Sequence, residues 1–163
     1  MRIKTYVLSV FVVVLFLSSG TDKANFNEGF RLGNIAPRIE LLEVDADIEF
    51  ANDSGHYTLL HFWAAYDGES RMRNVQLWNK LKQDGLSHVK MISISMDELQ
   101  SVFAETVKAD KLEMTTQLHE KLGERSDVYK KYGLKKGFRT FLIDDRGVIV
   151  EINVTPDKLR IKN

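Results

Sequence analysis

The most informative stretch of the chain runs from residue 62 to residue 71 and reads FWAAYDGESR. The apolar segment that leads into it, 57–63, predicts a strand that is buried on both faces of a sheet. Apolar residues at helical spacing over 70–83 predict a helix after it, and Gly85 is a typical C-terminal stop. The turn between strand and helix carries Asp67, Gly68, Glu69 and Ser70.

This stretch resembles the active-site segment of the thioredoxin-like superfamily, in particular its periplasmic thiol-disulfide oxidoreductase branch, whose members read FWAxWCxxCR. Asp67 and Ser70 stand at the two cysteine positions, and the whole chain contains no cysteine. A second segment from residue 132, YGLKKGFRTFLIDDRG, is similar to the family pattern YGVxGxPTxFLIDxxG. The resemblance implies an α/β, thioredoxin-like fold with a central mixed sheet flanked by helices.

The missing sulfur has a firm chemical consequence. Thiol–disulfide exchange begins when a thiolate attacks a disulfide, and it proceeds through a mixed disulfide. Asp67 cannot form that intermediate, and Ser70 cannot resolve it. Reduction of peroxides also begins at a thiolate. The sequence therefore excludes a dithiol redox reaction by this chain alone, and we expect no catalytic residue of that kind and no cofactor.

The second half of the family's catalytic centre is altered as well. In the family, a cis-proline faces the cysteines and shapes the groove for the substrate backbone, whereas Phe138 falls at that position here, with Arg139 beside it. A cis bond before a residue other than proline costs roughly 2.5–4 kcal/mol, so we expect a trans loop. One functional hypothesis is an ion pair between Arg139 and the acidic residues near Asp67. The alternative is that residues 67–70 simply cap the helix.

Several other polar and aromatic residues have both structural and functional interpretations. His61 lies where thioredoxins carry a buried acid that shuttles protons, and without a thiol we expect only a hydrogen-bonded histidine. Trp63 and Tyr66 could line a shallow aromatic recess. The alternative is that Trp63 belongs to the core and Tyr66 stays partly exposed. The four histidines have no spacing typical of a metal site, so we predict none.

Basic residues cluster near the C-terminal third of the chain. They are Lys130, Lys131, Lys135, Lys136 and Arg139. A solvated face is the simplest interpretation, and a patch for an acidic partner is the alternative. The formal charge of +0 for the whole chain gives no indication of nucleic-acid binding.

The remaining pattern agrees with the thioredoxin layout. Asp97 is predicted to cap a helix, and Gly133 to close a short one over 126–132. We expect a short hairpin over 39–50, a strand over 89–96, an ambiguous segment over 112–122, and strands over 139–143 and 148–154 joined by a turn. The short tail after Pro156 predicts a truncated C-terminal helix.

The N-terminus has the pattern of an export signal. Residues 1–20 combine two basic residues, an apolar run over 6–17 and small residues at 18–20, as in a signal peptide. The run is shorter than the roughly 20 residues that span a bilayer. We therefore predict a signal peptide over 1–20, a linker over 21–36 and a thioredoxin-like domain over 37–163. Export to a bacterial periplasm without stable membrane insertion follows, and an uncleaved N-terminal anchor is the alternative.

These features together predict a redox-inactive binding or interaction module for a protein or peptide partner. Its candidate face comprises the degenerate active-site positions and their neighbours: Trp63, Tyr66, Asp67, Gly68, Glu69, Ser70, Phe138 and Arg139. One alternative is an accessory protein of a thiol-disulfide pathway, which binds substrate for a true oxidoreductase. Another is an enzyme with different chemistry centred on Asp67 and Glu69.

Overall fold

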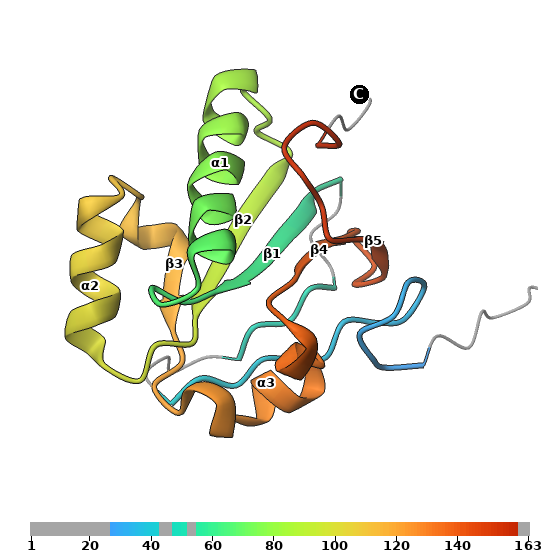
Figure 1. Ribbon diagram of the computed structural model, residues 1–163. Coiled ribbons are helices and arrows are strands. Elements are labelled where there is room, and N and C mark those ends of the chain that lie inside the picture. The colour runs from blue at the N-terminus through green and yellow to red at the C-terminus, as the bar shows by residue number, and fades with distance from the viewer. Residues whose placement is uncertain (1–26, 43–46, 52–54, 160–163) are drawn as a thin grey trace, which may run out of the picture.

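The computed structural model describes residues 27–42, 47–51 and 55–159, so the predicted signal peptide lies outside the described residues. The helices and strands follow one another as β1 (Tyr57–Trp63), α1 (Gly68–Asp84), β2 (Val89–Ser95), α2 (Gln100–Ala109), β3 (Gln117–His119), α3 (Asp127–Lys131), β4 (Thr140–Ile143) and β5 (Ile149–Ile152) (Figure 1). Single 3-10 turns occur at Met114–Thr116, Gly123–Arg125 and Leu134–Lys136.

The strands form one mixed sheet in the order β3-β2-β1-β4-β5. β1 and β2 pair in parallel along their whole length, from Tyr57 opposite Val89 to Trp63 opposite Ser95. β4 runs antiparallel to both β1 and β5, as expected for a hairpin that follows a parallel unit. The structure confirms the predicted thioredoxin-like α/β fold.

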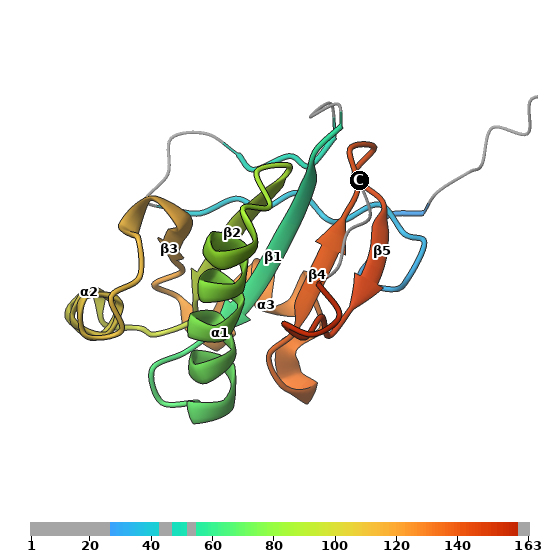
Figure 2. The ribbon, with the colours of Figure 1, turned by 90° about the horizontal axis from the view of Figure 1, so that it is seen from above.

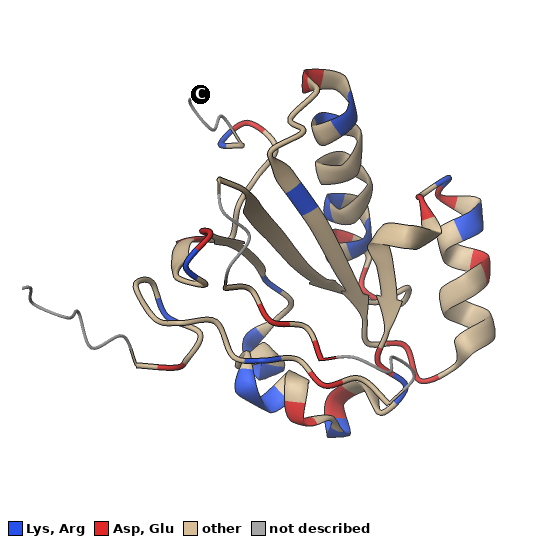
Figure 3. Ribbon diagram, turned by 180° about the vertical axis from the view of Figure 1, so that it is seen from behind, with Lys and Arg blue, Asp and Glu red and all other residues tan. Residues whose placement is uncertain are grey.

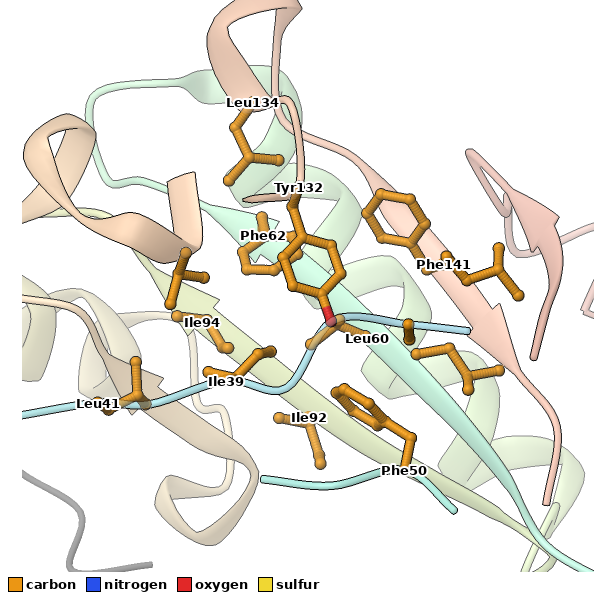
Figure 4. Packing of buried hydrophobic residues seen from close by; sticks show 14 of the residues in the cluster. Ile39, Leu41, Phe50, Leu60, Phe62, Ile92, Ile94, Tyr132, Leu134 and Phe141 are labelled. Carbon is orange, nitrogen blue, oxygen red and sulfur yellow. The ribbon is translucent and has the colours of Figure 1, made fainter. Parts of the chain in front are cut away.

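Helices and chain segments cover both faces of this sheet (Figure 2). α1 lies on one face and packs Leu77 and Leu81 against Leu59 and Met91. The opposite face is covered by α3 and by the segment that precedes β1. Figure 4 shows its main apolar cluster, which includes Ile39, Leu41, Phe50, Leu60, Phe62, Ile92, Ile94, Tyr132, Leu134 and Phe141.

Both ends of α1 have the capping residues that the sequence predicts. The Asp67 carboxylate accepts a hydrogen bond from the Ser70 amide at 2.8 Å, which satisfies one of the free N–H groups of the first turn. Gly85 ends the helix with a left-handed backbone, φ 60°, and its N–H donates to the Leu81 carbonyl. These two caps fix where the helix begins and where it ends.

The predicted cap at Asp97 is wrong. α2 is preceded by Leu99, which makes no side-chain capping bond. Asp97 is 4% exposed, and its carboxylate accepts hydrogen bonds from the Ala65 amide at 2.9 Å and from the Ser95 hydroxyl at 2.7 Å. The residue therefore joins the end of β2 to the loop after β1 because both ends meet at the same edge of a parallel pair.

Residues 27–36 fall within the range predicted as a linker, and they lie against the domain. The Gly33 amide donates to the Ile149 carbonyl at 2.8 Å, and the Ile149 amide donates to the Asn34 carbonyl at 2.8 Å. The Phe30 ring contacts the backbone at Gly133, where a Cβ would lie 2.8 Å from the ring carbon Cζ. This segment runs along β5 and covers its open side.

The chain after β5 forms turns as far as the described residues extend, to Leu159. Val154 and Leu159 are buried and pack with Leu142 on the face that carries α1. A short apolar segment therefore covers this part of the sheet face. Within the described part of the chain, no helix is both long enough and apolar enough to cross a membrane.

Candidate functional site

The two former cysteine positions are closed by hydrogen bonds. The Asp67 amide donates to the Ala64 carbonyl at 3.1 Å, and the Ser70 hydroxyl donates to the Asp67 carbonyl at 3.1 Å. The Ser70 oxygen also accepts from the Ala64 amide at 3.4 Å, and the residue is only 6% exposed. This geometry confirms the capping interpretation, and it leaves the Ser70 hydroxyl without the exposure that a nucleophile needs.

The exposed acidic residue of the turn pairs with its own helix. Glu69 lies 3.3 Å from the Arg73 guanidinium, four residues further along α1. Its side chain is 81% exposed, so the pair contributes about 0.3–0.5 kcal/mol. Glu69 is therefore engaged in a surface ion pair with its own helix.

The hypothesis of an ion pair at Arg139 is wrong. In the described residues, no carboxylate lies within ion-pair distance of Arg139. Its guanidinium carbon lies 5.6 Å from the centre of the Phe30 ring, a cation–π contact with the segment before the domain's first strand. The loop 137–139 has trans peptide bonds, as expected, and the Arg139 carbonyl accepts from the Phe62 amide at 3.0 Å.

Two aromatic side chains connect the turn and the facing loop. The Tyr66 and Phe138 rings lie 6.2 Å apart at 55°, and Tyr66 is 65% exposed. Burial of part of the ring, with Glu124 and Asp97 nearby, raises the pKa of Tyr66. Trp63 is fully buried against Phe103, so it belongs to the core and not to the exposed face.

A shallow apolar recess continues this surface away from the turn. Its exposed apolar members are Tyr66, Leu99 at 63% and Val102 at 39%, and Ala65, Asp97 and Glu98 also line it. Together with half-buried Phe138, these exposed apolar side chains form the aromatic–apolar face, which consists of Tyr66, Leu99, Val102 and Phe138. The sequence did not predict Leu99 or Val102 as surface residues because their helical spacing is typical of a buried stripe.

On the other side of Phe138 lies a polar cavity of about 390 Å³. The first turn of α1 and the loop around Gly137 form two of its walls, and Asn153 and Thr155 line a third. Arg73 and Lys136 bring positive charge to a cavity that also contains Asp67 and Glu69. Four lining residues lie outside the turn and belong to no sequence motif: Arg73, Lys136, Asn153 and Thr155. Only the fold brings them together.

His61 is the buried titratable group beneath this site. Its Nε2 lies 2.9 Å from the Ser70 carbonyl and its Nδ1 lies 2.8 Å from the Thr140 hydroxyl. A carbonyl only accepts, so Nε2 carries the hydrogen and Nδ1 accepts from Thr140. Burial lowers the pKa of His61 from 6.5 to about 4. The structure confirms a hydrogen-bonded strand histidine that is neutral at physiological pH.

A buried polar layer under α1 was missed by sequence reasoning. Asn74 is fully buried, donates to the Gln117 side chain at 2.9 Å and accepts from the Ser93 hydroxyl at 2.5 Å. The one feature of the sequence that could have indicated this layer is the polar Asn74 within the apolar stripe of the helix. This layer joins α1 to β2 and β3 and holds the helix that presents the turn.

The described residues contain no cluster of His, Asp and Glu that fits a metal ion. The four predicted lysines are exposed around α3 and the following turn, Arg139 is half-buried, and acidic residues lie beside the lysines on α3 and the turn before it (Figure 3). Lys130, for example, lies 3.3 Å from Asp127. This mixed pattern supports a solvated face.

A solved structure shares both the fold and much of the sequence. The crystal structure of a thioredoxin-like protein from Parabacteroides distasonis is 56% identical, with a TM-score of 0.75, and the match covers 82% of this chain and 95% of that one. This chain belongs to the thioredoxin-like proteins. No model of a protein family and no curated protein matches it.

This thioredoxin-like protein also shares its fold with more distant structures. The thioredoxin domain of a thiol-disulfide oxidoreductase from Bacteroides vulgatus is 20% identical, with a TM-score of 0.65 over 79% of this chain and 92% of that one. A thiol-disulfide oxidoreductase from Bacteroides fragilis is 20% identical, with a TM-score of 0.61 over 77% and 94%. With no cysteine, the thioredoxin-like protein described here cannot perform dithiol exchange itself.

Proposed function

We propose that this thioredoxin-like protein is an exported, redox-inactive binding module that holds a polypeptide partner on its aromatic–apolar face. The observation that carries the proposal is the aromatic pair of exposed Tyr66 and half-buried Phe138, which stands at the former active site in a chain without cysteine. Aromatic side chains that are exposed and held by neighbours are typical anchors of protein interfaces.

The surroundings of that pair support polypeptide binding over chemistry. Leu99 and Val102 extend the apolar surface on one side, and the polar cavity at Asp67 and Arg73 offers hydrogen-bonding groups on the other. An apolar centre beside a polar rim is the usual anatomy of an interface. Asp67 serves as a helix cap, and Glu69 is held in a surface pair with Arg73.

Export is the second part of the proposal, and it rests on the sequence of residues 1–20. If these residues act as a signal peptide, the mature protein reaches an oxidising compartment. A cysteine-free domain is suited to such a compartment because it cannot form wrong disulfides. Fractionation of the source bacterium, with an antibody against the domain, tests the location. Recovery of the full-length chain from the cytoplasmic fraction would contradict export.

Binding is tested with immobilised protein, a periplasmic extract and identification of the retained proteins by mass spectrometry. The double variant Tyr66→Ser/Phe138→Ser should lose about tenfold or more of its specific partner, as expected for interface anchors. Met72→Ser changes another exposed apolar side chain on α1, 56% exposed, and should retain the partner. Thermal unfolding verifies that both variants fold. Equal retention by the double variant would contradict the proposal.

The same experiment addresses the accessory role. Capture of many reduced, unfolded polypeptides would favour a protein that presents substrate to a true oxidoreductase, whereas one stable partner favours the dedicated module. Reduction of insulin by dithiothreitol should show no acceleration in either case, because exchange requires a thiolate.

A further inference from the structure

A pocket lies where the segment before β1 meets the turn after α3. Its volume is about 430 Å³, which is within the range of small-molecule sites. Its walls come from three parts of the chain: residues 30–32, the stretch from Gly133 to Arg139, and Ile152 at the end of β5. We call it the cationic pocket, and none of its lining residues belongs to the aromatic–apolar face.

Part of the lining of this pocket is apolar. Phe30 and Ile152 are half-buried and pack against the main apolar cluster, and Leu32 is 67% exposed. The Phe30 ring also contacts the backbone at Gly133, which holds it in place. A hydrocarbon group in the pocket would remove apolar surface of these side chains from water.

All the charged side chains that line the pocket are basic. They are Arg31, Lys135, Lys136 and Arg139. Among the described residues, no carboxylate lies within ion-pair distance of any of them, in contrast to Lys130, which pairs with Asp127. Glu28 and Glu151 are close in sequence to the pocket, but neither lines it. Like charges gathered at one opening attract anions and repel cations.

The fold fixes the position of Arg139 best among these charged groups. The residue is half-buried, and its carbonyl accepts from the Phe62 amide at 3.0 Å. Its guanidinium carbon lies 5.6 Å from the centre of the Phe30 ring, and its side chain donates no hydrogen bond to a described residue. The N–H groups of Arg139 are therefore available to an anionic acceptor, and a guanidinium binds a carboxylate through paired N–H bonds.

We infer that the cationic pocket binds a small carboxylate that carries a hydrocarbon chain, as a medium-chain fatty acid does. The carboxylate pairs with Arg139 and lies beside Lys135, and the hydrocarbon chain covers Phe30 and Leu32. A small molecule suits the volume of the pocket, and its two ends match the two kinds of lining. This ligand is additional to the polypeptide partner of the aromatic–apolar face, and neither inference depends on the other.

Titration of the ¹⁵N-labelled protein with octanoate tests the inference. Octanoate should cause saturable shifts of the amide resonances of Gly133, Lys135 and Ile152. Hexanoate has a shorter chain and should bind up to about tenfold more weakly, because less apolar surface is buried. Acetate, which has the charge without the chain, and octyltrimethylammonium, which has the chain with the opposite charge, should bind much more weakly than octanoate.

Matched charge variants separate the pocket from general attraction. Arg139→Gln should weaken octanoate binding by about tenfold, as for a lost charge-assisted hydrogen bond, and Arg139→Lys should retain part of the affinity. Lys135→Gln should weaken it by about two- to fivefold, as for an exposed charge pair. Lys131→Gln removes the same charge from an exposed position of α3 outside the pocket and should leave binding unchanged. Leu32→Ser should reduce the advantage of octanoate over hexanoate.

Thermal unfolding verifies that each variant folds. Absence of a saturable shift at Gly133 and Ile152 with octanoate would overturn the inference. Equal binding of acetate, or equal weakening by Lys131→Gln and Lys135→Gln, would also overturn it, because either result indicates attraction by charge alone. Tighter binding of a capped acidic heptapeptide than of octanoate would assign this surface to a polypeptide and would contradict the small-molecule site.

Discussion

Lowering the pH from 7 to 4 should destabilise this protein through His61. The imidazole is 1% exposed, and burial lowers its pKa from 6.5 to about 4. In the unfolded chain the same group takes up a proton near pH 6.5. Between pH 6.5 and pH 4 the unfolded state therefore binds more protons than the folded state, and the free energy of unfolding falls as the pH falls.

The size of the effect follows from the difference between the two pKa values. Each pKa unit corresponds to 1.36 kcal/mol, so complete titration of His61 in the unfolded state removes roughly 3 kcal/mol of stability by pH 4. This is a large part of the 5–15 kcal/mol that is typical of a folded domain. Below pH 4 both states carry the proton, and this contribution becomes constant.

Urea unfolding followed by circular dichroism at a series of pH values measures the effect. His61→Gln is the comparison, because an amide can donate to the Ser70 carbonyl and accept from Thr140 while it remains neutral at every pH. The stability of the variant relative to the native protein should rise by about 3 kcal/mol from pH 7 to pH 4. Carboxylates contribute equally to both proteins and cancel in the comparison.

An NMR titration of the His61 ring provides a second measurement that needs no substitution. The ring should remain neutral at pH 6 and titrate with a midpoint near pH 4. A midpoint close to 6.5, or parallel loss of stability in the native protein and His61→Gln, would refute the reasoning.

Three further substitutions test the site and its support. Gly133→Ala should cost about 2 kcal/mol or more of unfolding free energy, because φ is +63° and the new Cβ would lie 2.8 Å from the Phe30 ring. Gly85→Ala is the comparison: φ is +60° but the space around it is open, so it should cost about 1 kcal/mol. Chemical denaturation compares the two, and equal losses would contradict the role of the contact. Asp67→Ala should lower stability by about 1 kcal/mol through the lost helix cap, and Asp67→Asn should restore most of it; a thermal melt in which both variants match the native protein would contradict that cap. Asp67→Cys with Ser70→Cys should give at most slight insulin reductase activity because Phe138 occupies the loop where the family has its cis-proline, and activity like that of an ordinary thioredoxin would show that this loop is harmless.

The part of the fold that sequence predicts best is the part with strict local patterns. The apolar run 57–63, the helix from Ser70 to the stop at Gly85 and the hairpin around residues 144–147 each carry a period or a turn signal, and each is present in the structure. Local chemistry also predicts the capping role of Asp67, since its partner is only three residues away.

The features that sequence reasoning missed depend on contacts between distant segments. Asp97 has the residue type of a cap, yet its carboxylate bonds to Ala65, 32 residues away. Arg139 has the charge for an ion pair, yet its guanidinium lies over Phe30. In both cases the side chain had several chemically acceptable partners, and only the packing of the sheet decides which one lies within reach.

The amide of Asn74, held between Ser93 and Gln117, restricts how α1 can sit on the sheet. A helix that contacted the strands through leucines alone could turn about its axis or slide by part of a turn with little loss. Any such movement would leave the buried side chains of Asn74, Ser93 and Gln117 without these hydrogen bonds, at about 1–3 kcal/mol for each. The orientation of α1 therefore depends on residues other than Asp67 and Ser70. The helix keeps its position on the sheet without a disulfide bond.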